Sequence, residues 1–131
     1  MPMTFNTGDE VSVAFTASLN AMMEEVAVVE TDHKFWDQES FLAERTRVRN
    51  LMLVEKLTLT SGEIHEAIDA MRNGNPRSQK IPEFSCVEEE LADAFIRLIG
   101  TAKRFGARLP EAVLAKNEYN IGRPPMHGKE F

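Results

Sequence analysis

Apolar residues recur along the chain at three- and four-residue steps, which is the spacing of one face of an α-helix. The first run has its stripe at Val11, Phe15, Leu19, Met22, Val26 and Val29. Before it stands Thr7-Gly8-Asp9-Glu10, where a capping residue is followed three places later by an acid, as at many helix starts. The pattern predicts a helix that ends at about residue 33.

A second helix is predicted from about residue 40 to residue 72, with a bend near Asn50. Its clearest stripe consists of Leu53, Leu57, Ile64, Ile68 and Met71. Segment 34–38 interrupts the pattern and is predicted to be a junction. Residues 58–62 are mostly weak helix formers, so contacts beyond local propensity are needed there. Asn73-Gly74 supplies a stop signal.

Two further helices follow a loop over residues 74–84, which is rich in glycine and proline. Ser85 and Glu88 form a capping box, and a helix is predicted from there to Gly106. Pro110 suits the first turn of a short last helix over residues 110–120. The tail over residues 121–131 holds two glycines and two prolines and is predicted to be irregular. The stripe of the third helix consists of Val87, Leu91, Ala94, Phe95, Leu98, Ala102 and Phe105.

Short connections between amphipathic helices predict an all-α fold, a four-helix-type bundle in a single domain over residues 1–131. The third helix also carries Ile96 and Ile99 away from its main stripe. Apolar surface on two sides of one helix predicts burial against another subunit, in a homodimer or homotetramer.

Charge and cysteine content narrow the possible partners. The net charge is −6, from 21 acidic and 15 basic side chains, whereas proteins that bind nucleic acid usually carry a basic excess. Cys86 is the only cysteine, so no intramolecular disulfide forms. The first residues lack the pattern of a signal peptide, and no uninterrupted apolar run is long enough for a membrane span. We therefore expect a cytoplasmic protein with neither nucleic-acid nor membrane partners.

A six-residue pattern occurs twice. Glu63-Ile64-His65-Glu66-Ala67-Ile68 in the second helix matches Glu90-Leu91-Ala92-Asp93-Ala94-Phe95 in the third. Each has an acid, a large apolar residue, a variable residue, an acid, an alanine and a large apolar residue. Acids three apart share one helix face, so two such helices packed antiparallel present their acid pairs to each other.

Four carboxylates that face one cleft repel one another, and a divalent cation relieves that repulsion. Oxygen ligands favour hard ions, so magnesium is expected, with manganese as a substitute. Magnesium also recruits substrate phosphates, which points to phosphate chemistry. A di-iron carboxylate bundle needs two Glu-x-x-His motifs, and only the spacing from Glu30 to His33 provides one.

Several blocks resemble the MazG-like nucleoside triphosphate pyrophosphohydrolases. They are Lys34-Phe35-Trp36-Asp37, the two acid patterns, Lys116-Asn117-Glu118-Tyr119-Asn120-Ile121-Gly122-Arg123-Pro124 and His127-Gly128-Lys129. The resemblance extends from about residue 34 to the C-terminus. Thr60-Ser61-Gly62 departs from it, which affects the choice of substrate more than the metal site.

The resemblance implies an oligomeric all-α enzyme that hydrolyses nucleoside triphosphates between the α and β phosphates. Its catalytic metal ligands would be Glu63, Glu66, Glu90 and Asp93. Six residues are expected to contact the substrate: Lys34, Trp36, Lys116, Asn120, Arg123 and Lys129. For Trp36, stacking on the base competes with a packing role at the junction. Two alternatives stay open, a non-catalytic helical adaptor and the related phosphoribosyl-ATP pyrophosphohydrolase.

Two further basic residues lie near the acid patterns. Arg97 stands one turn after Asp93, and we expect it to pair with Asp93 and orient it. Lys56 is expected to be exposed to solvent.

Overall fold

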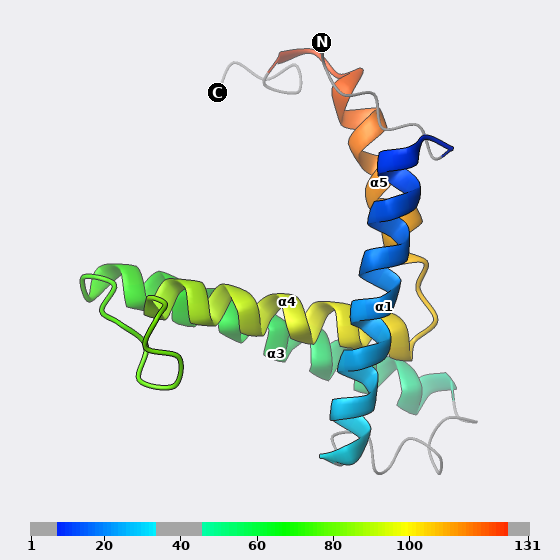
Figure 1. The fold of residues 1–131 in the computed structure, drawn as a ribbon. Helices are drawn as coiled ribbons and strands as arrows, with labels where there is room; N and C mark the ends of the chain where they lie inside the picture. Colours follow the sequence, from blue (N-terminus) through cyan, green and yellow to red (C-terminus); the bar gives the residue numbers. More distant parts are fainter. Residues whose placement is uncertain (1–7, 34–45, 126–131) are drawn as a thin grey trace.

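The computed structural model describes residues 8–33 and 46–125, and these ranges contain four helices (Figure 1). They are α1 (Glu10–Asp32), α3 (Thr46–Arg72), α4 (Cys86–Arg104) and α5 (Leu109–Ile121). The described ranges hold no strand, and a single isolated bridge joins Arg77 and Ser85. The all-α prediction is confirmed. The predicted junction at residues 34–38 and the helix start at residues 40–45 lie outside the described residues.

The ends of the helices follow local signals, with one difference from the prediction. Asp9 caps α1, because its extended backbone lets the carboxylate accept from the amide of Ser12 at 2.6 Å. The cap is therefore Asp9 rather than Thr7, which lies outside the described residues. At α4 the capping box of Ser85 and Glu88 is confirmed.

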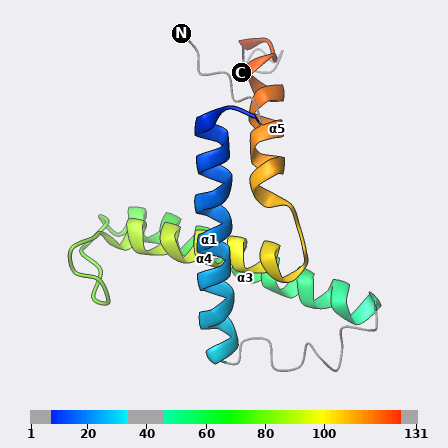
Figure 2. The same cartoon turned by 45° about the vertical axis from the view of Figure 1, so that its right-hand side comes forward.

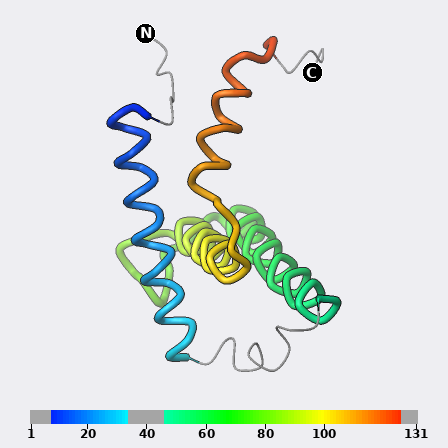
Figure 3. The backbone as a smooth tube through the Cα atoms, turned by 90° about the vertical axis from the view of Figure 1, so that its right-hand side faces the viewer, coloured from blue at the N-terminus to red at the C-terminus, as the bar shows by residue number. Residues whose placement is uncertain are grey.

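The helices form two crossing pairs (Figures 1 and 2). α3 and α4 lie side by side and run antiparallel, which confirms the arrangement expected for the two acid patterns. α1 and α5 also run antiparallel; α1 crosses one end of that hairpin, and α5 extends away from the same end (Figure 3). Among the described helices α3 contacts α4 alone, whereas α4 also contacts α1 and α5. α4 is therefore the central helix.

The core lies where α1 crosses the second half of α4. Its buried members are Leu19 and Met23 of α1 and Ile99 and Ala102 of α4, with Val26 and Leu109 packed against them. Ile99 is fully buried. Gly100 lets α1 approach closely, since a Cβ there would lie 2.8 Å from Cδ of Glu30 and 2.9 Å from Cγ1 of Val26. The absence of a side chain at residue 100 therefore sets the distance between α1 and α4.

The two apolar sides predicted for α4 are divided between different surroundings. The side of Ile99 packs against α1, whereas the main stripe is largely exposed in the single chain. The predicted stripe of α3 is exposed as well, with Ile64 44% and Ile68 43% accessible. The exposed members of the two stripes are Leu57, Ile64, Ile68, Met71, Leu91, Phe95 and Leu98. The interior of the chain therefore leaves much of the predicted apolar surface uncovered.

α1 is the one described helix that is long and apolar enough, by length and composition alone, to cross a membrane. No uninterrupted apolar run predicts such a span, and in this structure α1 supplies the buried side chains of Leu19 and Met23. Lys103 of α4 also forms an ion pair with Glu24 of α1. The helix is thus part of the packed core.

Two glycine-to-alanine substitutions test the packing of α1 on α4. Gly100→Ala should lower the free energy of unfolding by about 1–3 kcal/mol, because the stiff side chain of Val26 must move away. Gly62→Ala is the matched control, because Gly62 lies inside α3 and its added Cβ meets nothing within 4 Å. It should raise the free energy of unfolding by up to about 1 kcal/mol through helix propensity. Urea denaturation measures both, and equal effects would contradict the close approach.

Candidate functional site

The acid patterns of α3 and α4 meet across the hairpin. Glu63, Glu90 and Asp93 each offer a carboxylate oxygen, and these three oxygens lie within 4.8 Å of one another. Glu66 lies beside this group, near enough to Glu63 and Glu90 to change the pKa of both. The structure thus brings the four predicted ligands together. The assignment of these residues as metal ligands stays a prediction.

The alanines of the repeated pattern explain how the two helices come so close. Ala67 is the only buried residue among the described positions of α3, and α4 is the only described helix that α3 contacts. Ala94 of α4 is buried too, at 5% exposure. Small side chains at a helix contact shorten the distance between the axes. Each alanine directly follows the second acid of its pattern, so the contact places the acids at its edge.

The proximity of the carboxylates changes their protonation. Burial, together with the charges and hydrogen bonds of Glu66 and Glu63, raises the pKa of Glu90 from 4.5 to about 7. Burial also acts to raise the pKa of Glu63, but hydrogen bonds from Arg97 and Glu66 and the charge of Arg97 outweigh it and lower the pKa. Near neutral pH the cluster therefore holds a proton on Glu90 for much of the time.

Arg97 joins the cluster through a different partner from the one predicted. Its Nε donates to Oε1 of Glu63 at 2.6 Å, across the two helices, rather than to Asp93 on its own helix. The side chain of Glu63 is only 12% exposed, whereas that of Arg97 is 44% exposed, so the pair joins a buried carboxylate to a guanidinium that reaches water. Arg97 thus fixes the orientation of one candidate ligand, and the prediction of Asp93 as its partner is wrong.

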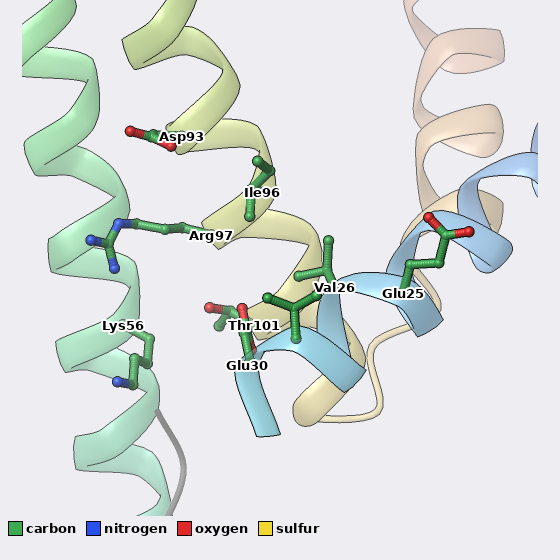
Figure 4. A pocket seen from close by; sticks show the side chains of 9 residues that line it. Glu25, Val26, Glu30, Lys56, Asp93, Ile96, Arg97 and Thr101 are labelled. Carbon is green, nitrogen blue, oxygen red and sulfur yellow. The ribbon is translucent and has the colours of Figure 1, made fainter. Parts of the chain in front are cut away.

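A cavity of about 430 Å³ opens beside the acid cluster, between α1, α3 and α4 (Figure 4). Asp93 and Arg97 belong to both the cluster and the cavity lining. The apolar part of the lining comes from Val26, Val29 and Ile96. Glu25, Glu30, Lys56 and Thr101 complete it. An apolar pocket with a few polar groups is the usual form of a small-molecule site.

Lys56 was predicted to be exposed, but it is half-buried and lines the cavity. The signal for this position was its spacing, because Lys56 stands seven residues before Glu63 and two helical turns bring it to the same face. No spacing in the sequence indicated that α1 would contribute side chains to the cavity. Glu30 and Val26 reach the cavity only because α1 crosses α4 at Gly100.

The predicted substrate contacts on α5 lie apart from the acids in the single chain. Lys116 places its Nζ 4.4 Å from the centroid of the Tyr119 ring, and Arg123 places its guanidinium carbon 5.7 Å from the same ring. Asn120 is exposed. α5 makes no contact with α3, and none of these three residues lines the cavity beside the acids. Lys34, Trp36 and Lys129 lie outside the described residues.

Comparison with curated proteins supports the resemblance seen in the sequence. The chain is 36% identical over 81 residues to dCTP pyrophosphatase 1 of Mus musculus, and 37% identical over 81 residues to the protein of the same name from Homo sapiens. Each alignment covers 60% of this chain and 46% of the relative, so the matched region is about half the length of these relatives. No protein-family model matches the chain, and no solved structure does. The predicted resemblance to nucleoside triphosphate pyrophosphohydrolases is confirmed by these relatives.

The raised pKa of Glu90 predicts a pH dependence of stability. Since the pKa in the folded chain lies above the ordinary value of 4.5, the stability present below about pH 4.5 is lost as the pH rises through about 7. The amide in Glu90→Gln cannot ionise. At pH 8 in a chelator, this variant should therefore unfold with a free energy about 1–2 kcal/mol higher than the parent, allowing for solvent screening.

At pH 5 most of that difference should disappear, because Glu90 is then protonated in the parent as well. Thermal melts at both pH values measure the effect. Glu55→Gln is the matched control, since Glu55 is an exposed residue of α3 outside the cluster. If Glu90→Gln and the parent differ by the same free energy of unfolding at pH 5 and at pH 8, the pKa of Glu90 is not raised by its surroundings.

Proposed function

We propose that this chain is a magnesium-dependent nucleoside triphosphate pyrophosphohydrolase, which cleaves between the α and β phosphates and releases a nucleoside monophosphate and pyrophosphate. The observation that carries the proposal is the meeting of the acid pairs of α3 and α4 beside a cavity that Asp93 lines. The relatives named dCTP pyrophosphatase 1 support the same class of reaction. The base and the sugar that the chain accepts are left open.

The donor set fits a hard divalent cation. All four candidate ligands are carboxylates, and three of their oxygens converge within 4.8 Å. The shift in the pKa of Glu90 shows the repulsion that such an ion would relieve. Glu63, Glu66, Glu90 and Asp93 would hold magnesium, or manganese in its place. When bound, the ion supplies neutralisation of phosphate charge and a more acidic coordinated water.

The chain's own residues supply positioning and hold a proton. Glu90 has a pKa of about 7 before an ion binds, so binding of the cation would release a proton from it near neutral pH. Arg97 holds Glu63 in place, so the cluster is oriented before the substrate arrives. Val26, Val29 and Ile96 offer the nucleoside an apolar surface next to Asp93, which brings the phosphates to the acids. The other predicted substrate contacts and a cytoplasmic location stay predictions.

We also propose that the active form is a homodimer built on the exposed stripes of α3 and α4. The 100° step of the helix places Ile64 and Ile68 on the opposite side of Ala67 from Glu63 and Glu66, so a partner on this face leaves the acids open. The seven large apolar side chains of these stripes are each 39% to 61% exposed in the single chain, so the face offers a continuous apolar surface to a partner. The same stripes on a second copy are the complementary occupant, as in a two-fold interface.

A charge placed on this face should separate the subunits. Ile68→Glu should convert the dimer to a monomer, because the interface would bury an unpaired carboxylate. Val113→Glu on α5 is the matched control, since Val113 is 41% exposed and Ile68 is 43% exposed. Size-exclusion chromatography with light scattering measures the mass. A parent that is monomeric at micromolar concentration, or an Ile68→Glu variant that stays dimeric, would contradict this interface, and a parent mass of four chains would indicate a tetramer.

The products of hydrolysis test the function directly. Incubation with a panel of ribo- and deoxynucleoside triphosphates, dCTP included, plus magnesium should give monophosphate and pyrophosphate in equal amounts. Ion-exchange chromatography resolves these from diphosphate and orthophosphate. Glu63→Gln and Asp93→Asn should each lower kcat/KM at least about 100-fold, or about 2.7 kcal/mol of transition-state stabilisation.

The matched control is Asp69→Asn, because Asp69 lies one turn after Glu66 in an exposed pair with Arg72 at 3.3 Å. It should keep kcat/KM within twofold of the parent. Release of orthophosphate and diphosphate would refute cleavage between the α and β phosphates. Absence of turnover with every triphosphate would support the non-catalytic adaptor. Turnover of phosphoribosyl-ATP alone, when it is added to the panel, would support the related hydrolase.

A further inference from the structure

The loop between α3 and α4 is folded by its own hydrogen bonds. Gly74 and Asn75 take positive φ angles of 82° and 49° and reverse the chain after α3. The amide of Val87 donates to Oδ1 of Asn75 at 3.0 Å, and the amide of Cys86 donates to the carbonyl of Pro76 at 2.8 Å. The amide of Ser78 donates to the carbonyl of Phe84 at 2.9 Å. The start of the loop is thus tied to the first turn of α4, and the bond between Ser78 and Phe84 closes the loop on itself.

Ser78 and Glu89 form the centre of this loop. The Ser78 hydroxyl, which is buried, donates to Oε2 of Glu89 and accepts from the amides of Lys80 and Ile81 at 3.1 and 3.0 Å. The other carboxylate oxygen of Glu89 pairs with Nζ of Lys80 at 2.9 Å. Glu89 is itself buried, and a buried charge needs compensation. The Ser78 hydroxyl and the Lys80 ammonium provide it. The arrangement fixes the backbone of Lys80 while leaving its side chain 78% exposed.

This anchor places a cation next to the acid cluster. Glu89 precedes Glu90 and stands one turn before Asp93, so Lys80 lies along the same stretch of α4 as two of the candidate ligands. Its pKa is raised by the hydrogen bond and charge of Glu89, and also by the charges of Asp93 and Glu90. The cavity opens at the other side of Asp93, towards Ile96 and Arg97. Lys80 and the cavity thus lie at opposite ends of the acid cluster.

On the basis of the proposed function, we propose that Lys80 is a substrate-binding residue that contacts the β and γ phosphates and the departing pyrophosphate. The order along α4 gives the substrate a direction, with the nucleoside in the cavity, the α phosphate at the acids and the pyrophosphate at Lys80. Arg97 is already paired with Glu63, so Lys80 supplies positive charge at the end of the cluster away from the cavity. The Lys80 side chain is 78% exposed and flexible, so its ammonium can turn towards a phosphate while the Ser78 hydroxyl keeps its hydrogen bond to the buried Glu89 carboxylate.

Product inhibition separates this role from a structural one. Lys80→Gln should raise the inhibition constant of magnesium pyrophosphate about tenfold, because one charge-assisted contact is lost. The inhibition constant of the nucleoside monophosphate should change less than twofold, since that product lies on the cavity side. Lys80→Arg should restore pyrophosphate inhibition to within threefold of the parent. Lys103→Gln is the matched control, because Lys103 is paired with Glu24 at the far end of α4.

Calorimetric titration of the full chain with magnesium pyrophosphate keeps the two proposals distinguishable. A parent that hydrolyses triphosphates while Lys80→Gln binds pyrophosphate as tightly as the parent would overturn the role of Lys80 alone. If Lys80→Gln weakens the binding of pyrophosphate and of nucleoside monophosphate equally and lowers the melting temperature, the substrate-binding role is also overturned, and Lys80 acts in the folding of the loop. A parent that binds magnesium pyrophosphate through Lys80 but turns over no triphosphate would refute the hydrolase and leave the phosphate contact standing.

Discussion

The close approach of α3 and α4 is the constraint on which the rest of the site depends. Ala67 and Ala94 are buried in this hairpin, and their small side chains allow the two helices to come close together. Each alanine directly follows an acid, so the same contact that packs the hairpin also concentrates negative charge. The packing of the hairpin therefore buries Glu90 beside Glu66 and Glu63, and this burial, together with their charges, raises the pKa of Glu90.

The surroundings of the cluster compensate its charge on both sides. Arg97 lies on the cavity side and holds Glu63. Lys80 lies towards the loop and is held by Glu89 and, through it, by Ser78. The internal hydrogen bonds of the loop between α3 and α4 thus determine the position of the Lys80 backbone. The loop fixes the backbone of Lys80 but leaves its ammonium free to move, whereas Arg97 already orients Glu63 before a ligand binds.

α4 performs three tasks with three different faces. One face, with Ile99 and Gly100, packs against α1 and forms the core. A second carries Glu90 and Asp93 towards α3, and a third exposes Leu91, Phe95 and Leu98. Only the first of these faces contributes to the hydrophobic core, so the core of one chain is small. The exposed stripes of α3 and α4 lie on the other side of Ala67 and Ala94 from the acids, so the dimer proposed above would leave the acids accessible.

The sequence by itself determined the positions of the described helices, the capping box at Ser85 and the meeting of Glu63, Glu90 and Asp93 with Glu66 beside them, because these follow from helical periodicity and local hydrogen bonds. Other features were decided only by the tertiary structure. The pairing of Arg97 with Glu63, the half-buried position of Lys56 and the contribution of Glu30 to the cavity depend on how α3, α4 and α1 cross. Periodicity specifies which face of a helix is apolar, but not which neighbour covers it, so the exposure of the stripe at Ile64 and Ile68 could not be read from spacing.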